Sequence, residues 1–136
     1  MCLYIDKTKH RRGIIKTYCK IAKEDICVYK LLRYVPFRGY YTPFRYKPVI
    51  FNENMCTLKA DKFKGTTTLN EITHGVHAYL YCPNSDFYQD FNAIIPKGTK
   101  YYLGKNGDIV AEQMLIFRNS MIFYLYCNKF KVVRIY

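Results

Sequence analysis

The stretch that decides the fold is residues 91–117, FNAIIPKGTKYYLGKNGDIVAEQMLIF. Its apolar segments are short, and each ends at a turn signal, which is typical of strands. Pro96 and Gly98 stand where a type I turn favours them, and Asn106-Gly107 is the strongest short hairpin signal. The stretch therefore predicts antiparallel strands, which we place at 91–95, 99–103 and 108–117.

The same pattern continues on both sides of this stretch. Apolar runs bounded by turn residues predict further strands at 26–32, 75–81, 121–127 and 130–136. Residues 83–86 offer a turn and a helix cap, and 52–70 predict a loop with a short helix or an extra strand. We expect an α+β fold: a twisted, mainly antiparallel sheet with a C-terminal meander and one or two short helices. The whole chain, 1–136, is expected to be one domain, with a basic N-terminal arm at 1–25 and a sheet-rich core at 26–136.

Residues 29–51, YKLLRYVPFRGYYTPFRYKPVIF, combine five basic side chains with eight aromatic rings and no acid. Guanidinium groups between rings suit a surface that holds a phosphate while it stacks on a flat group. The alternative is that the rings are core residues at strand spacing and that the basic side chains only face water. On the first interpretation, phosphate contacts come from Arg33, Arg38, Arg45 and Lys47, stacking groups are Tyr40, Tyr41 and Phe44, and His77 lines the same site.

The net charge of +12, from 22 Lys and Arg against 10 Asp and Glu, favours encounter with anionic partners. A second acid-free basic segment spans residues 7–20. The six cysteines form no CxxC pair and follow no apolar leader, so we expect reduced thiols in a cytoplasmic protein. The longest apolar run is too short to cross a bilayer, so no membrane partner is expected.

Catalytic and metal-binding patterns are weak throughout the chain. His74 and His77 fall on opposite faces of a strand and have no evident third ligand, so no metal is expected. Glycine-rich phosphate loops and serine nucleophile motifs are absent from the sequence. Glu112 lies in an apolar strand, where it either faces solvent or is held by a base. If the protein is an enzyme, Glu112 and His77 are the candidate catalytic residues.

Two resemblances add to this interpretation. The segments at 1–4, 21–32, 41–44, 75–79 and 94–102 together resemble a family of small uncharacterised proteins from Bacteroidetes bacteria and their phages. That resemblance implies a phage or mobile-element accessory protein acting in the bacterial host cytoplasm. Ile95-Pro96-Lys97-Gly98-Thr99 followed by Glu112 is similar to the late strands of ADP-ribosyltransferase-type domains, which implies an NAD-consuming activity.

The sequence thus favours a non-catalytic binding protein without a cofactor. Its expected ligand carries phosphate and is a nucleotide or a nucleic acid. A phage protein would use such a binding site to sequester a nucleotide signal. The alternatives are an ADP-ribosyltransferase-like enzyme and a protein-interaction module with an acidic partner.

Overall fold

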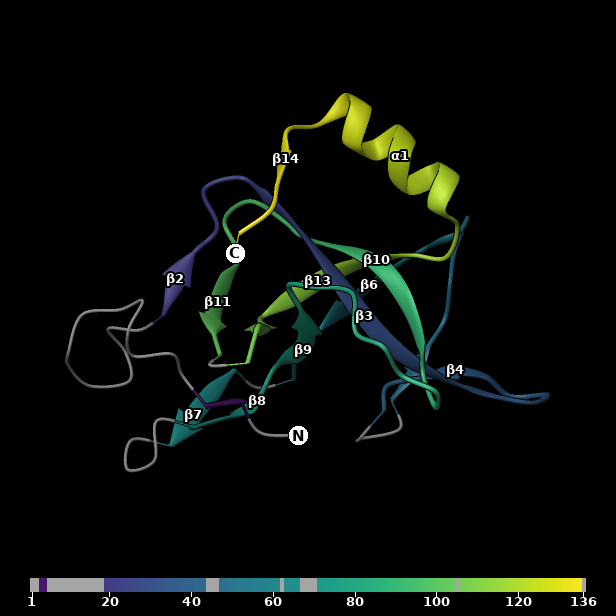
Figure 1. Cartoon of the computed structure of the whole chain (residues 1–136), viewed down its shortest axis with the longest axis horizontal. Helices are drawn as coiled ribbons and strands as arrows, with labels where there is room; N and C mark the ends of the chain where they lie inside the picture. Colours follow the sequence, from purple (N-terminus) through teal and green to yellow (C-terminus); the bar gives the residue numbers. More distant parts are fainter. Residues whose placement is uncertain are drawn as a thin grey trace.

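The computed structural model describes residues 3–4, 19–43, 47–61, 63–66, 71–104 and 106–135 of the chain. The strands are β1 (Leu3–Tyr4), β2 (Lys20–Ile21), β3 (Asp25–Val35), β4 (Gly39–Tyr41), β5 (Pro48–Val49), β6 (Met55–Lys59), β7 (Lys64–Thr66), β8 (Glu71–His74), β9 (Val76–Tyr79), β10 (Gln89–Ile95), β11 (Lys100–Leu103), β12 (Asp108–Ala111), β13 (Gln113–Phe117) and β14 (Val132–Val133); the helix is α1 (Ser120–Lys129). The α+β class and the twisted antiparallel sheet are confirmed (Figure 1).

The main sheet follows the order β2-β11-β12-β9-β3-β10-β13-β6, with β4, β5 and β14 attached through β3. A separate small sheet has the order β1-β8-β7. Between β12 and β13 the chain bends at the exposed Glu112, whose backbone bonds to Lys100 and Ala60 instead of continuing one ladder. Before the bend, β12 pairs with β11 and β9; after it, β13 pairs with β10 and β6. The sheet therefore curls around its core.

Strand β3 is the longest strand and the centre of the sheet (Figure 1). It is buried on both faces over most of its length because two different clusters cover it. Val28 and Leu32 belong to the large core inside the curled sheet, and Cys27 belongs to a smaller cluster with Phe123 of α1. β10 pairs with β3 along its full seven residues, from Ile95↔Ile26 to Gln89↔Leu32. Such a doubly buried strand explains the continuous apolar run in the sequence.

The prediction of a strand at 121–127 is wrong, because Ser120–Lys129 form helix α1. Asn119 caps this helix by accepting a hydrogen bond from the backbone N–H of Met121 at 2.8 Å. Phe123 and Tyr126, three residues apart, both pack edge-on against Phe117 of β13. A short run that is apolar at every position has no period, so it fits a buried strand as well as a helix.

Other expectations had mixed outcomes. The hairpin around Asn106-Gly107 is confirmed by the register of β11 with β12, and Gly107 has φ 73° as a hairpin turn requires. The expected helical turn after 83–86 is wrong: Ser85 Oγ accepts from the N–H groups of Phe87 and Tyr88, but the chain forms bends and then enters β10. The loop at 52–70 contains two strands, β6 and β7. In the expected basic arm, residues 7–18 lie outside the described residues, and Lys20–Ile21 form β2.

The five described cysteines are free thiols, and the one helix in the described ranges is too short to cross a membrane. Compartment and domain boundaries stay predictions.

Gly75, between β8 and β9, provides a test of how tightly the curled sheet is packed. It has φ +146°, and a Cβ there would overlap the Val110 side chain and approach Phe63 Cδ2 to 3.2 Å. Gly98 is the matched control, since it also has a positive φ (+88°) but has no atom within 4 Å of its Cβ position. We expect Gly75→Ala to lower the free energy of unfolding by about 3 kcal/mol, because strain and overpacking add, and Gly98→Ala by about 1 kcal/mol. Urea unfolding of both variants measures this, and equal losses would contradict close packing at Gly75.

Candidate functional site

A cavity of about 270 Å³ lies where strands β3 and β9 separate. The two strands pair only at Tyr29↔Tyr79; from there β3 continues to β4, whereas β9 stays with β12. The loop between β9 and β10 and the residues after β4 enclose the resulting gap. The lining residues are Lys30, Leu31, Pro43, His77, Tyr79, Pro83, Asn84, Ser85 and Tyr88.

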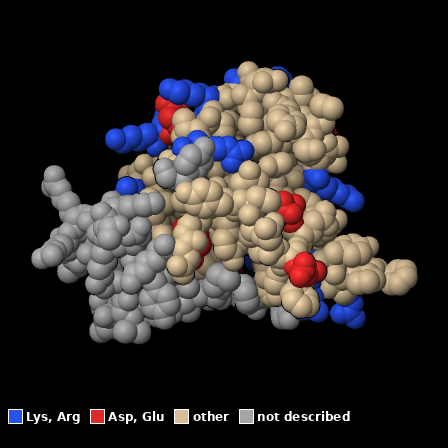
Figure 2. All heavy atoms as spheres, viewed as in Figure 1, with Lys and Arg blue, Asp and Glu red and all other residues tan. Residues whose placement is uncertain are grey.

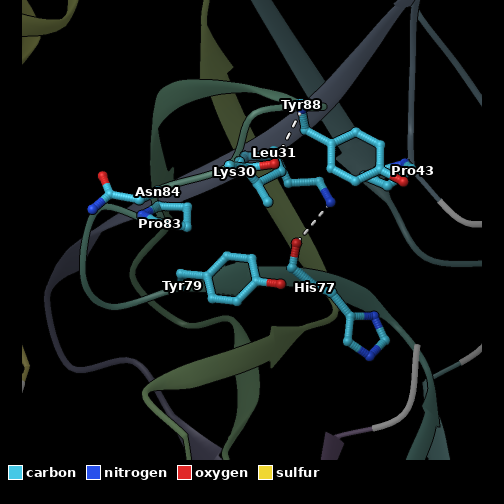
Figure 3. A pocket seen from close by; sticks show the side chains of 9 residues that line it. Lys30, Leu31, Pro43, His77, Tyr79, Pro83, Asn84 and Tyr88 are labelled. Atoms are coloured by element: carbon cyan, nitrogen blue, oxygen red, sulfur yellow. Dashed lines mark hydrogen bonds between the residues drawn. The ribbon is translucent and has the colours of Figure 1, made fainter.

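The side chain of Lys30 is the central polar group of this cavity (Figure 3). Residues alternate between the two faces of β3, so Lys30 follows Ile26 and Val28 into the interior, and it is only 4 % exposed. Its ammonium donates a hydrogen bond of 2.7 Å to the carbonyl oxygen of His77 in β9. The lysine therefore bridges the two strands just beyond the point where their backbone ladder ends.

Burial lowers the pKa of Lys30 from 10.5 to about 8. At neutral pH the amine is still mostly protonated, so a charge is held in an apolar place. An ammonium carries three N–H donors, and the described residues supply one acceptor, the His77 carbonyl. The ion pairs among the described residues are Lys47–Asp61 and Lys131–Glu24, and neither involves Lys30. A buried cation without a counter-ion is costly, and an incoming anion would relieve that cost.

The other walls combine rings with a few polar groups. Tyr79 points its hydroxyl toward the Lys30–His77 bond, and the Tyr88 ring lies on the other side of the ammonium (Figure 3). Burial, with Asp108 and Tyr88 as smaller causes, raises the pKa of Tyr79, so its hydroxyl stays a donor at neutral pH. Apolar walls with a few converging polar groups are typical of small-ligand sites.

The residues that the sequence singled out on 29–51 do not form one described cavity. Arg33 and Arg38 are exposed on the β3–β4 hairpin, and Tyr41, half-buried, is the cross-strand partner of Arg33. Tyr40 packs into a cluster of rings, with centroids 5.2 Å from Phe91 and 5.8 Å from Phe51. Its ring is thus largely used in packing.

The remaining predicted residues have separate positions. Lys47 forms an ion pair with Asp61 at 3.4 Å and donates to the carbonyl of Lys59 at 3.1 Å. His77 lines the cavity with its backbone, and its imidazole points away from the Lys30 ammonium (Figure 3). Phe44 and Arg45 lie outside the described residues, directly after the cavity residue Pro43.

The alternative catalytic residues are not brought together at the cavity. The register sets His77 opposite Val110, whereas Glu112 is exposed at the bend after β12 and is absent from the cavity lining. Within the ranges that the structure describes, no group of three or more His, Cys, Asp or Glu residues is placed to hold a metal ion.

Lys30 was missed as a site residue, although the sequence contains a signal for it. In the strand Ile26–Leu32, residues 26, 28, 30 and 32 share one face, and three of the four are aliphatic. A lysine in phase with core positions is unusual, since lysine is almost never fully buried without a partner.

Comparison with protein-family models, curated proteins and solved structures gave no match for this chain. The functional conclusion therefore depends on the chemistry of the cavity.

The burial of Lys30 makes a prediction about stability. Below pH 8 the amine is charged in both the folded and the unfolded state, so the full desolvation cost is present; a shift from 10.5 to about 8 corresponds to about 3 kcal/mol. Between pH 8 and 10.5 only the unfolded state holds this proton, so the cost fades as pH rises. We expect Lys30→Met to raise the free energy of unfolding by about 2 kcal/mol at pH 7, after loss of the bond to His77. This gain should shrink toward zero by pH 10.5.

Urea unfolding of wild type and variant at pH 7, 8, 9 and 10 tests this, because tyrosine and cysteine titrations cancel in the difference. Lys97→Met, which removes an exposed lysine, is the matched control and should change stability little at any pH. A Lys30→Met protein that is less stable than wild type at pH 7 would mean that the strand bridge outweighs the cost of the charge.

Proposed function

We propose that the protein binds a small phosphate-bearing ligand of mononucleotide size in the cavity between β3 and β9, without catalysing a reaction on it. The observation that carries this proposal is the buried Lys30 ammonium, which has one described acceptor and no described counter-ion. A phosphate oxygen would supply the missing negative charge and the missing acceptors together.

The size of the cavity favours a single small molecule. At about 270 Å³ it lies just below the range of about 300–1,000 Å³ that is usual for drug-sized ligands. A polynucleotide instead needs an extended basic surface that follows several phosphates. Arg33 and Arg38 are exposed on the β3–β4 hairpin, which ends at Tyr41, two residues before the cavity residue Pro43. They would raise the local concentration of anions.

Some of the cavity residues have a specific role in this proposal. Lys30 would neutralise the anionic group, and the Tyr79 hydroxyl, which points toward the Lys30–His77 bond, would contact the same group (Figure 3). The ring of Tyr88 and the apolar side of Pro83 offer flat surfaces for a base or another planar group. Sequestration of a nucleotide signal in a bacterial host is the biological role that we attach to this chemistry as a prediction.

Binding of nucleotides is the direct test. Isothermal titration with AMP, GMP, CMP and UMP should give binding for at least one of them, and the matching nucleoside and inorganic phosphate should bind more weakly. Lys30→Met should lower the affinity by at least about 30-fold, because a buried charge pair loses one partner. Lys97→Met, which removes the same charge at an exposed position, should leave the affinity within about twofold.

Two outcomes would overturn the proposal. If Lys30→Met keeps full affinity while Arg38→Gln loses it, the ligand binds the exposed hairpin and not the cavity. If none of the mononucleotides binds wild type, the phosphate-bearing ligand class is wrong at this site.

A further inference from the structure

We propose that the outward face of helix α1 is a docking surface for an amphipathic helix of an acidic partner protein. This surface consists of Met121, Tyr124 and Leu125. Lys129 lies at its C-terminal end, and Arg118, whose guanidinium lies 6.0 Å from the centre of the Phe51 ring, comes just before its N-terminal end. It is independent of the nucleotide cavity, since none of its residues lines that cavity.

The first observation is that α1 is apolar on both sides. Its sequence, SMIFYLYCNK, has no acid and one base, and a helix that is apolar all round is normally buried. Here only Phe123 is buried, whereas Met121 and Tyr124 are each 65 % exposed and Leu125 is 52 % exposed. Three large apolar side chains at positions i, i+3 and i+4 form a continuous stripe on the solvent side.

The second observation is that the inner side fixes this helix in place. Phe123 and Tyr126 pack on Phe117, with ring centroids 5.4 and 5.3 Å away. The Tyr126 hydroxyl also donates to Asp25 Oδ2 at 2.8 Å. The helix therefore cannot turn its outer stripe inward without breaking these contacts, so the stripe stays available to a partner.

Charge identifies the kind of partner. Residues 113 to 135 contain no Asp or Glu, and their Lys and Arg side chains are Arg118, Lys129, Lys131 and Arg134. Two nearby acids are already engaged, since Glu24 pairs with Lys131 and Asp25 accepts from Tyr126 of the helix. Figure 2 shows the region over α1 as largely uncharged, with basic side chains at its border. Carboxylates at the edge of a partner would complement this arrangement.

A second copy of the chain fits this surface poorly. If two α1 helices packed antiparallel, Arg118 of each copy would lie next to Lys129 of the other, and like charges at the rim oppose such a dimer. A lipid surface also fits less well. The helix is 10 residues, or about 15 Å, and stable membrane anchoring needs more apolar contact or a second signal. Spacing of i, i+3 and i+4 instead matches the ridges of helix-on-helix packing.

The experiment uses the full chain and two synthetic helical peptides. One carries Leu at its a and d positions and Glu at the flanking positions, and the other has Lys in place of every Glu. Fluorescence polarisation should show binding of the Glu peptide that is at least about tenfold tighter than binding of the Lys peptide. Leu125→Asp should remove this binding, and the double variant Arg118→Glu/Lys129→Glu should reverse the preference. Lys97→Met, an exposed charge change away from α1, is the control and should leave binding unchanged.

Backbone NMR shifts locate the contact and decide between the outcomes. Shifts confined to residues 118–130 on addition of the Glu peptide support the proposal. Equal binding of both peptides, or shifts elsewhere, would overturn it. Sedimentation that shows a dimer lost on Leu125→Asp would assign the face to self-association, and tight binding to anionic vesicles through Leu125 without peptide binding would assign it to lipid. A folded Leu125→Asp protein, verified by circular dichroism, is required in each arm, and Tyr124→Ser replaces it if that variant does not fold.

Discussion

One strand with a changing set of neighbours determines most of this structure. Along one edge, β3 pairs with β10 over seven residues without a break. Along the other edge it pairs with β14 at Asp25 and Ile26, with β9 at Tyr29, and with β4 from Arg33 to Val35. Each change of neighbour leaves this second edge of β3 unpaired for a few residues. The candidate cavity lies at one of these changes, and the Lys30 side chain reaches across it to β9.

Burial of the Lys30 ammonium lowers the free energy of unfolding, which is the reason to assign this residue a function. Its neighbours on the same face of β3 are Val28 and Leu32, which are fully buried, and Met or Leu in its place would suit the same environment. A bond to one carbonyl oxygen does not offset the desolvation of an ammonium. Perturbed lysines of this kind occur at structural networks as well as at binding sites, and the networks supply a counter-ion. The described residues around Lys30 supply none, which favours the binding site.

The parts of the fold that sequence could predict are those governed by local chemistry. The backbone preferences of Pro96, Gly98 and Asn106-Gly107 predict turns, and these turns set the limits of the strands on either side. Helix α1 could not be predicted in this way, because its inner face is defined by contacts outside the helix, with Phe117 of β13 and with Asp25 of β3. The helix depends on those tertiary contacts more than on any periodic pattern.

The candidate site was less predictable than the fold for a related reason. The mixture of aromatic and basic residues at 29–51 suggested a binding surface, yet composition does not determine which side chains face the interior and which face solvent. Tyr40 is committed to the ring cluster with Phe51 and Phe91, and Lys47 to Asp61. Lys30 was in the same stretch, and its role depends on where β9 leaves β3, a property of the sheet order and not of local sequence.

The cavity and the α1 face differ in how strongly a substitution would affect the stability of the fold. The cavity consists of an unpaired strand edge with a charge buried inside the molecule, so a substitution there would change the free energy of unfolding together with the proposed binding. The α1 face is outside the packed clusters, because Met121, Tyr124 and Leu125 point to solvent while Phe123 and Tyr126 hold the helix. A substitution on that face should therefore affect the proposed docking with little effect on the core. The strand that follows α1, β14, pairs with β3 at Asp25 and Ile26, and Asp25 is five residues before Lys30. Variants at either place therefore need a measured unfolding free energy before a change in binding is interpreted.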